Sequence, residues 1–142
     1  MRAGSTVTVD YKSAEFNTSF GHPYGPMIAY MAACPSSGCE NVDLLAPIWF
    51  KIWEAGLLSG NYVDGHWAMK EVFEGANLEF PTPKGLKAGK YLLRHEMINL
   101  QTGPVQFFPN CVQLDVSGDG GKVPQAEELV SFPGAYDGNS GK

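Results

Sequence analysis

Short apolar runs recur along the chain between turns rich in glycine and proline. Residues 5–10 alternate apolar and polar side chains with a period of two, and residues 26–32 are almost continuously apolar. Alternation of this kind is typical of a strand with one buried face, and a short apolar run between turn signals is typical of a fully buried strand. The pattern predicts strands at residues 5–10, 26–32, 48–53, 78–80, 90–100, 105–116 and 129–132.

Two features of this pattern are specific enough to be tested. The two longest runs are joined by Gln101-Thr102-Gly103-Pro104, which predicts a β-hairpin. In the run at residues 48–53, strict alternation predicts that Trp49 and Trp53 share one face of the strand.

Little helix is expected. Residues 67–74 form one short helical candidate, and the polar, glycine-rich residues 117–128 predict a loop. Several short strands with frequent turns favour an all-β fold, an antiparallel sandwich with long loops.

Composition limits the classes of function. The chain has 142 residues, which fits one domain, and a formal net charge of −5 without a basic stripe. We therefore expect no nucleic acid and no anionic membrane surface among its partners. No apolar run approaches the roughly 20 residues that a membrane-spanning helix needs.

The three cysteines bear on the cellular compartment. Cys34 and Cys39 flank a four-residue turn that could bring their sulfur atoms together, and such a disulfide would indicate an oxidising compartment. Cys111 lies in a predicted strand and is left over. It is either a buried free thiol, since free cysteine packs as a small hydrophobe, or a cysteine whose partner lies on a segment outside this sequence.

The first residues carry no apolar signal-peptide core, so the protein is either cytosolic or begins further upstream. Asn17-Thr18-Ser19 matches the acceptor pattern for N-glycosylation, which is common by chance.

Five segments, in this order along the chain, resemble the auxiliary-activity family-nine lytic polysaccharide monooxygenases of fungi. They are His22-Pro23-Tyr24-Gly25-Pro26-Met27-Ile28-Ala29-Tyr30-Met31, Trp49-Phe50-Lys51-Ile52 with Trp67-Ala68 downstream, Leu86 to Glu96 (LKAGKYLLRHE), Gln106-Phe107-Phe108-Pro109-Asn110-Cys111, and Phe132-Pro133-Gly134-Ala135-Tyr136. The resemblance runs from about Ala3 to Tyr136.

The resemblance implies an immunoglobulin- or fibronectin-like β-sandwich and a secreted, extracellular protein. It implies oxidative cleavage of cellulose or a related β-glucan with copper, an external electron donor, and oxygen or peroxide. In this family a histidine brace holds the copper: an N-terminal histidine gives its amine and its ring, and a second histidine gives another ring nitrogen.

His22 matches the second histidine of that brace. The first has no counterpart, because His22, His66 and His95 are all internal. We therefore expect residues 1–142 to form a single domain that is incomplete at its N-terminus, with an incomplete copper site and impaired activity. The same resemblance pairs Cys111 with a cysteine further upstream, and Cys34 with Cys39 as a short second disulfide.

Three further residues match positions near the copper. Gln106 matches a family glutamine close to the oxygen site, and Phe108 stands where the family usually has an axial tyrosine, so the phenol oxygen is missing. Gln101 stands in place of a histidine and does not titrate. Gln106 and Phe108 are two residues apart, so they share a face of the strand.

For four other side chains we expect roles that do not involve copper. Tyr24 and Tyr136 are candidates for stacking on sugar rings at a flat surface. His95 is expected to be structural, and His66 is expected to pack beside Trp67.

Three functions remain open at this point. The first is a copper monooxygenase whose natural chain starts upstream of Met1. The second is a non-catalytic polysaccharide-binding sandwich, favoured by Gln101, Phe108 and the missing histidine. The third is a general immunoglobulin-like interaction module.

Overall fold

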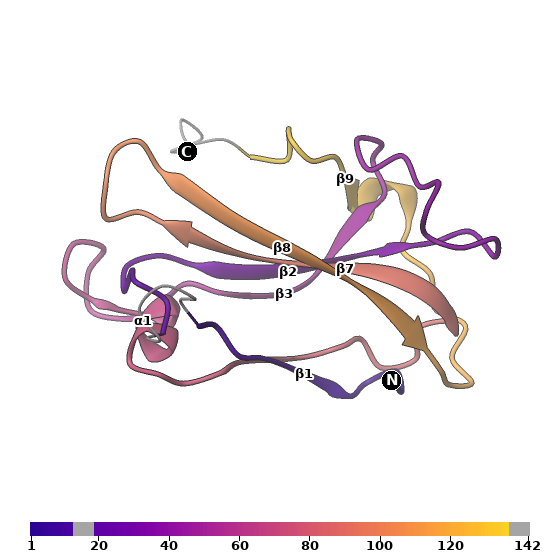
Figure 1. The fold of residues 1–142 in the computed structure, drawn as a ribbon, viewed down its shortest axis with the longest axis horizontal. Helices are drawn as coiled ribbons and strands as arrows, with labels where there is room; N and C mark the ends of the chain where they lie inside the picture. The colour runs from indigo at the N-terminus through magenta and orange to yellow at the C-terminus, as the bar shows by residue number, and fades with distance from the viewer. Residues whose placement is uncertain (13–18, 137–142) are drawn as a thin grey trace.

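The computed structural model describes residues 1–12 and 19–136. Its larger layer is a five-stranded sheet in which the strand order is β8-β7-β2-β3-β9 and every neighbouring pair is antiparallel (Figure 1). The strands are β2 (Met27–Ala33), β3 (Trp49–Ala55), β7 (Gly89–Asn99), β8 (Gln106–Val116) and β9 (Leu129–Val130).

A second layer covers one face of this sheet. It consists of β1 (Thr6–Val9) and β6 (Leu78–Pro81), which pair in antiparallel fashion and run below the sheet in the view of Figure 1. The predicted antiparallel sandwich is confirmed. Each of the seven predicted strands overlaps a strand of the structure, and β7 and β8 form the predicted hairpin.

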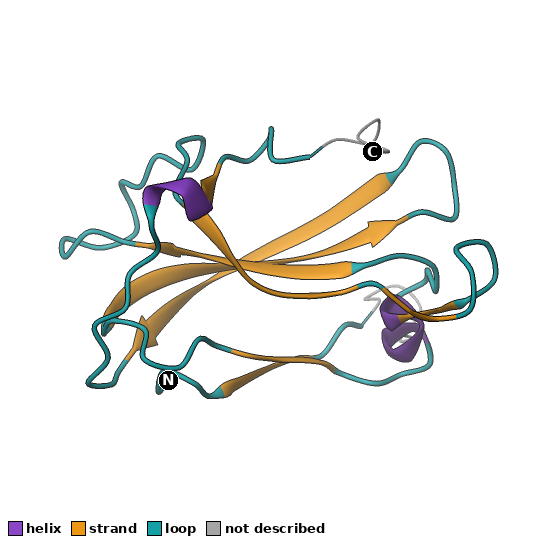
Figure 2. Cartoon of the chain, turned by 180° about the vertical axis from the view of Figure 1, so that it is seen from behind, coloured by secondary structure: helices purple, strands orange, loops and turns teal. Residues whose placement is uncertain are grey.

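The remaining elements are short (Figure 2). β4 (Leu57–Ser59) and β5 (His66–Trp67) form a small hairpin that leads into helix α1 (Ala68–Phe73), and η1 (Ala126–Glu128) precedes β9. The predicted helix is confirmed, the segment predicted as a loop is irregular except for η1, and the β4–β5 hairpin was not predicted. None of the described helices combines the length and hydropathy needed to cross a membrane.

The main core lies between the two layers. It is apolar because alternate residues of the large sheet face β1, β6 and α1, as the period of two requires. Its buried members include Met27, Ala29, Met31, Leu78, Phe80, Leu93 and Met97.

A β-bulge changes the face on which Trp53 lies. Ala29 pairs with Trp53 but the next residue, Tyr30, pairs with Lys51, so β3 holds one extra residue, Ile52. An extra residue reverses the alternation beyond it. Trp53 therefore packs in the main core while Trp49 packs on the opposite face, and the prediction that these two side chains share a face is wrong.

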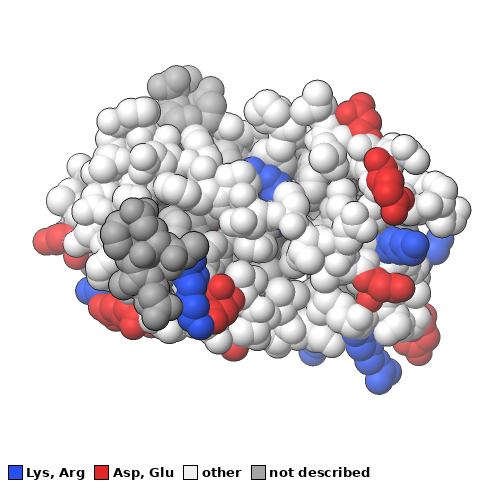
Figure 3. Space-filling view, in the orientation of Figure 1, with Lys and Arg blue, Asp and Glu red and all other residues white. Residues whose placement is uncertain are grey.

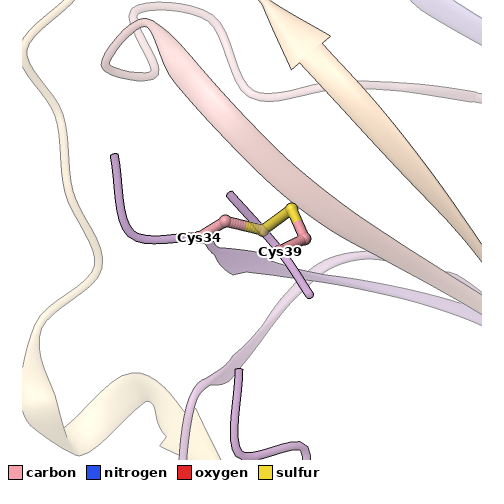
Figure 4. The surroundings of a disulfide bond; sticks show 2 residues. All are labelled: Cys34 and Cys39. Atoms are coloured by element: carbon pink, nitrogen blue, oxygen red, sulfur yellow. A yellow bond between two sulfur atoms is a disulfide. The ribbon is translucent and has the colours of Figure 1, made fainter. Parts of the chain in front are cut away.

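The opposite face of the sheet is covered by loops. The segments 34–48 and 130–136 cover four buried side chains there: Tyr30, Ala32, Trp49 and Leu92. The predicted disulfide between Cys34 and Cys39 is confirmed and ties the first of these segments into a short loop (Figure 4). We call this the outer face.

Charge is sparse over much of the surface seen in Figure 3. Acidic and basic side chains lie mostly toward the rim of that view, and no basic stripe crosses it.

Candidate functional site

The segment 19–26, which carries His22, is anchored at one end of the sandwich. The Ser19 hydroxyl donates to the Phe73 carbonyl of α1 at 2.7 Å, and the Leu100 amide donates to the Tyr24 carbonyl at 3.0 Å. Gly25 lies so close to β7 that a Cβ atom there would stand 1.8 Å from the Ile98 carbonyl oxygen. Glycine is required at this position, because any side chain would force the segment away from β7.

His22 is half-buried in an aromatic cluster. The ring centroid of His22 lies 5.6 Å from that of Phe20 and 5.7 Å from that of Phe108, and the two phenylalanine rings are 5.0 Å apart. Phe108 comes from β8, so the cluster joins the His22 loop to the edge strand of the large sheet. A cavity of about 270 Å³ opens beside it, lined in part by Phe20, His22 and Phe108.

Tyr11 and His95 extend this cluster into the interior. The Tyr11 ring packs edge-on against Phe20 at 5.9 Å and against His95 at 5.5 Å. The Tyr11 hydroxyl and Nδ1 of His95 share a hydrogen bond of 2.5 Å. Burial raises the pKa of Tyr11 to about 12, opposed by a hydrogen bond from Asn110, and burial together with the Arg94 charge lowers the pKa of His95. The pair is neutral near pH 7, which agrees with the expected structural role of His95.

Asn99 organises the β7–β8 turn. Its side chain has no exposed surface; Nδ2 donates to Oε1 of Gln106 at 2.8 Å, and Oδ1 accepts the amide of Gln101 at 2.9 Å. Gln106 lies opposite Asn99, and Phe108 lies opposite Met97, which belongs to the main core. Gln106 and Phe108 thus share the face predicted for them, while the Gln101 side chain is exposed in the turn.

The two candidate stacking tyrosines lie in different places. Tyr24 is half-buried and close in sequence to His22. Tyr136 lies on the outer face, where its hydroxyl donates to the Glu96 carboxylate and its ring stacks on Phe107 at 5.8 Å. Both its ring and its hydroxyl are engaged within the protein, and Tyr136 does not join His22.

The outer face holds a buried charged network around Tyr136. Arg94 Nη2 donates to Glu96 Oε1 at 2.7 Å, and the Arg94 guanidinium lies 4.0 Å from the centre of the Phe132 ring. Nη1 of Arg94 is buried without a hydrogen-bond partner in the described structure. A cavity of about 510 Å³ adjoins these residues.

Three other expectations can be compared with the structure. His66 does not simply pack beside Trp67: it is half-exposed, with Nε2 hydrogen-bonded to the Glu71 carboxylate that α1 presents to it. Cys111 is free and exposed, so the reading of a buried thiol is wrong. Asn17 and Thr18 of the glycosylation pattern lie outside the described residues.

Within residues 1–12 and 19–136, no three His, Cys, Asp or Glu side chains gather closely enough to hold a metal ion. Sequence reasoning missed Asn99 and Tyr11 as members of the site region. The available signal for Asn99 was a single amide side chain within the apolar stretch Met97-Ile98-Asn99-Leu100, just before the predicted turn.

Comparison with known proteins identifies close relatives in fungi. Over 135 residues the chain is 42% identical to the AA9 family lytic polysaccharide monooxygenase-like protein CEL1 of Agaricus bisporus, covering 94% of this chain and 41% of that protein. It is 38% identical to AA9 family lytic polysaccharide monooxygenase B of Heterobasidion irregulare, covering 94% of this chain and 53% of that protein. The chain thus spans about half the length of the curated relatives it matches.

The solved structures that resemble this chain come from the same class of proteins as its sequence relatives. A cellulose-active polysaccharide monooxygenase from M. thermophila superposes with a TM-score of 0.85 at 28% identity, over 98% of this chain and 62% of that one. HiLPMO9B superposes with a TM-score of 0.84 at 37% identity, over 96% and 59%. The expected immunoglobulin-like sandwich is confirmed by these neighbours.

The family model for Auxiliary Activity family 9, formerly GH61, matches residues 1–141. This match covers nearly the whole chain and includes all five segments that resemble the family. The chain belongs to auxiliary activity family 9.

Proposed function

We propose that this chain takes part in copper-dependent oxidative cleavage of cellulose or a related β-glucan, and that His22 is one of the copper ligands. Membership of a family whose relatives are named lytic polysaccharide monooxygenases supports the reaction class. The observation that carries the proposal is the half-buried imidazole of His22 at the end of the sandwich, held between Phe20 and Phe108 beside an open cavity.

The described residues fit copper only in part. Cu(II) prefers tetragonal nitrogen and oxygen ligands, and His22 offers one imidazole nitrogen. The amine of Met1 donates to the Asp115 carbonyl at 2.6 Å, at the other end of β8 from Phe108. Seven residues of strand separate these two positions, or about 23 Å, so this amine and His22 do not share a metal ion. The described residues alone do not complete a copper site, and we assign no reaction step to the metal.

The protein's own side chains fix the surroundings of His22. Phe20 and Phe108 restrict its ring, and Phe108 adds no oxygen ligand. Gln106 accepts a hydrogen bond from Asn99 through Oε1, which leaves its amide nitrogen as the donor of that side chain. Gln101 offers a neutral amide in the adjacent turn, and neither glutamine transfers a proton by titration.

We propose a cellulose or β-glucan surface as the partner, with an external electron donor as co-reactant. One structural neighbour is described as cellulose-active, which supports this substrate class. Tyr24 is the proposed sugar-stacking residue because it follows His22 by two positions in the chain and its backbone is held by Leu100. The Cys34–Cys39 disulfide supports an extracellular location, since such bonds persist in oxidising compartments.

A second function is favoured by one observation. Phe108 stands where the family usually has an axial tyrosine, so it supplies no phenol oxygen near His22. A sandwich with this substitution could bind a β-glucan surface without oxidising it.

Copper titration separates the two functions. Cu(II) is added to the metal-free chain and to His22→Ala, with binding followed by calorimetry and electron paramagnetic resonance. We expect His22→Ala to lose the binding, and the matched control His66→Ala to keep it, because the His66 ring is engaged with the Glu71 carboxylate.

The second measurement is product release from cellulose with ascorbate and hydrogen peroxide. Oxidised oligosaccharides that depend on His22 support the monooxygenase. Adsorption to cellulose without copper binding or oxidised products supports the non-catalytic function. A chain that neither binds copper nor adsorbs to any β-glucan contradicts both.

A further inference from the structure

The cavity on the outer face combines apolar walls with one buried ion pair. Its volume of about 510 Å³ lies in the range usual for sites that hold small organic molecules. Arg94 and Glu96, both from β7, supply the ion pair. The walls come from β8 and from the segment after β9, and they consist of aromatic rings and prolines: Phe107, Pro109, Phe132, Pro133 and Tyr136. These walls offer flat apolar area and carry no charge.

The ion pair leaves one hydrogen-bond donor without an acceptor. Both oxygens of Glu96 are already hydrogen-bonded, Oε1 to Nη2 of Arg94 at 2.7 Å and Oε2 to the Tyr136 hydroxyl. Nη1 of Arg94 has no hydrogen-bond partner among the described residues, although Arg94 is only 9% exposed. A buried donor without an acceptor costs free energy, and a ligand oxygen that accepts from Nη1 recovers that cost.

The charges favour a neutral acceptor over an anionic one. Arg94 and Glu96 neutralise each other, and Glu96 is 1% exposed. A bound carboxylate would lose its hydration and lie near the Glu96 carboxylate at a site of low dielectric constant. A neutral carbonyl oxygen accepts from Nη1 without either cost.

One wall of the cavity is able to admit a ligand. Nη1 itself has almost no exposed surface, so a ligand oxygen reaches it only when a neighbouring side chain shifts. Residues 132–136 lie beyond β9, and their backbone is held by the hydrogen bond from the Ala135 amide to the Ser131 carbonyl at 3.0 Å rather than by a strand ladder. A segment held in this way moves at lower cost than β8, which pairs with β7 along its whole length.

We infer that the outer-face cavity binds a small neutral aromatic molecule that carries a carbonyl oxygen. The ring of this ligand packs against Phe107 and Phe132, and its oxygen accepts a hydrogen bond from Nη1 of Arg94. The site is separate from the His22 cluster, because Phe107 stacks on Tyr136 while its neighbour Phe108 meets His22 across the other face of β8. Binding here therefore adds no ligand to copper.

Three probes test the chemistry of the site in the full 142-residue chain. Acetophenone has a ring and a neutral carbonyl, toluene has the ring alone, and benzoate has the ring with a charge. Each is titrated into the millimolar range, and binding is followed by the amide chemical shifts of the protein in nuclear magnetic resonance. We expect acetophenone to shift the amides of Phe107, Phe132 and Tyr136, and to bind about tenfold more tightly than toluene through the added hydrogen bond. Benzoate should bind more weakly than acetophenone.

Two variants separate the ring contact from the hydrogen bond. Phe107→Ala removes a wall and should weaken acetophenone and toluene alike. Its matched control is Val112→Ala, an exposed position on β8 that faces the other way and should leave both affinities unchanged. Arg94→Lys keeps a positive charge beside Glu96 but lacks Nη1, so acetophenone should fall to the affinity of toluene. If Arg94→Lys does not fold, the comparison of the three probes on the parent chain decides the question.

Several outcomes would overturn the inference. Equal affinities of acetophenone and toluene on the parent chain would show that Nη1 is not used, and tightest binding of benzoate would show that the site selects an anion. Shifts confined to Phe20, His22 and Phe108 would place the probe in the cavity beside His22. An absence of binding by all three probes would show that the outer-face cavity is not a ligand site. An unchanged copper titration in Phe107→Ala supports the separation of the two sites.

Discussion

Asn99 and Gln106 face each other across the β7–β8 hairpin, and the buried amide of Asn99 donates to Oε1 of Gln106 at 2.8 Å. The same asparagine accepts the Gln101 amide through Oδ1. Two residues singled out from the sequence as candidates near copper are therefore held by one side chain that was not. The turn next to the candidate site is organised by a buried amide, and its geometry depends on those two hydrogen bonds.

Replacing Asn99 with alanine tests this arrangement. The variant loses the side-chain hydrogen bonds to Gln106, Gln101 and Thr102 and leaves a small cavity at a position with no exposed surface. We therefore expect the free energy of unfolding to fall by about 2 kcal/mol. Chemical denaturation measures the change. Gln113→Ala, at an exposed position on the neighbouring strand β8, should stay within about 0.5 kcal/mol of the parent. Equal losses in the two variants would contradict the role given to Asn99.

Gly25 sets the path of the His22 segment, so Gly25→Ala should displace it. A Cβ atom at this position would overlap the Ile98 carbonyl, and the residue has φ +154°, which alanine rarely adopts. We expect a loss of about 2–3 kcal/mol in the free energy of unfolding, or a shifted segment with weaker copper binding through His22.

Gly21→Ala is the matched control for that variant, since a Cβ atom on Gly21 would meet nothing within 4 Å. It should leave both stability and copper titration close to those of the parent. If Gly25→Ala behaved like Gly21→Ala in both measurements, the close approach to β7 would not matter for the site.

Most strands followed from local pattern, and the exceptions have physical causes. Residues 90–100 and 105–116 were predictable because long β-rich runs flank a glycine-proline turn, and the hairpin formed as expected. The face of Trp53 was not predictable, because the bulge at Ile52 is set by the pairing of β3 with β2 rather than by either sequence alone. The β4–β5 hairpin was missed because Leu57–Ser59 is too short and too exposed to show a period.

In the candidate site, too, some residues could be predicted from the sequence and others could not. His22, Gln106 and Phe108 could be named from segments that resemble the family, and the structure brings His22 and Phe108 within 5.7 Å between ring centroids. Tyr136 was expected at a flat surface, but its hydroxyl meets the buried Glu96, forty positions away in the chain. A contact between residues so far apart in the chain cannot be predicted from the local sequence pattern.

The buried His95 should make stability depend on pH. Burial and Arg94 lower its pKa in the folded state, so the unfolded chain, with a histidine pKa near 6.5, binds a proton first as the pH falls. The folded state therefore loses stability below about pH 6.5, down to the lowered pKa of the folded state, with a slope of at most about 1.4 kcal/mol per pH unit. Above that window this contribution is constant.

Denaturant unfolding of the parent and of His95→Gln between pH 5 and 8 measures that slope. The glutamine keeps a hydrogen-bonding group beside Tyr11 but does not titrate, so the difference in stability between the two proteins should shrink as the pH falls below 6.5. A difference that stays constant over the whole range would show that His95 does not contribute to the pH dependence.

On the outer face, Arg94, Glu96 and Tyr136 form a network in which each member compensates another. Glu96 is 1% exposed and balances the charge of Arg94, while the Tyr136 hydroxyl occupies its other oxygen. Breaking a buried ion pair from one side leaves a charge without a partner, which commonly costs about 3–5 kcal/mol. Such a loss is a large part of the stability of a small domain, about 5–15 kcal/mol.

We therefore expect Glu96→Gln to lower the free energy of unfolding by about 3 kcal/mol or more, and Tyr136→Phe by about 2 kcal/mol through loss of a hydrogen bond to a charged group. The double variant should lose less than the sum, because the Tyr136 hydrogen bond has less value once the carboxylate is gone. Glu74→Gln, an exposed carboxylate 3.8 Å from Lys70, should change stability by less than about 1 kcal/mol. Additive losses in the double variant would mean that Tyr136 and Glu96 act independently, and that Tyr136 is free to serve elsewhere, including at a sugar surface.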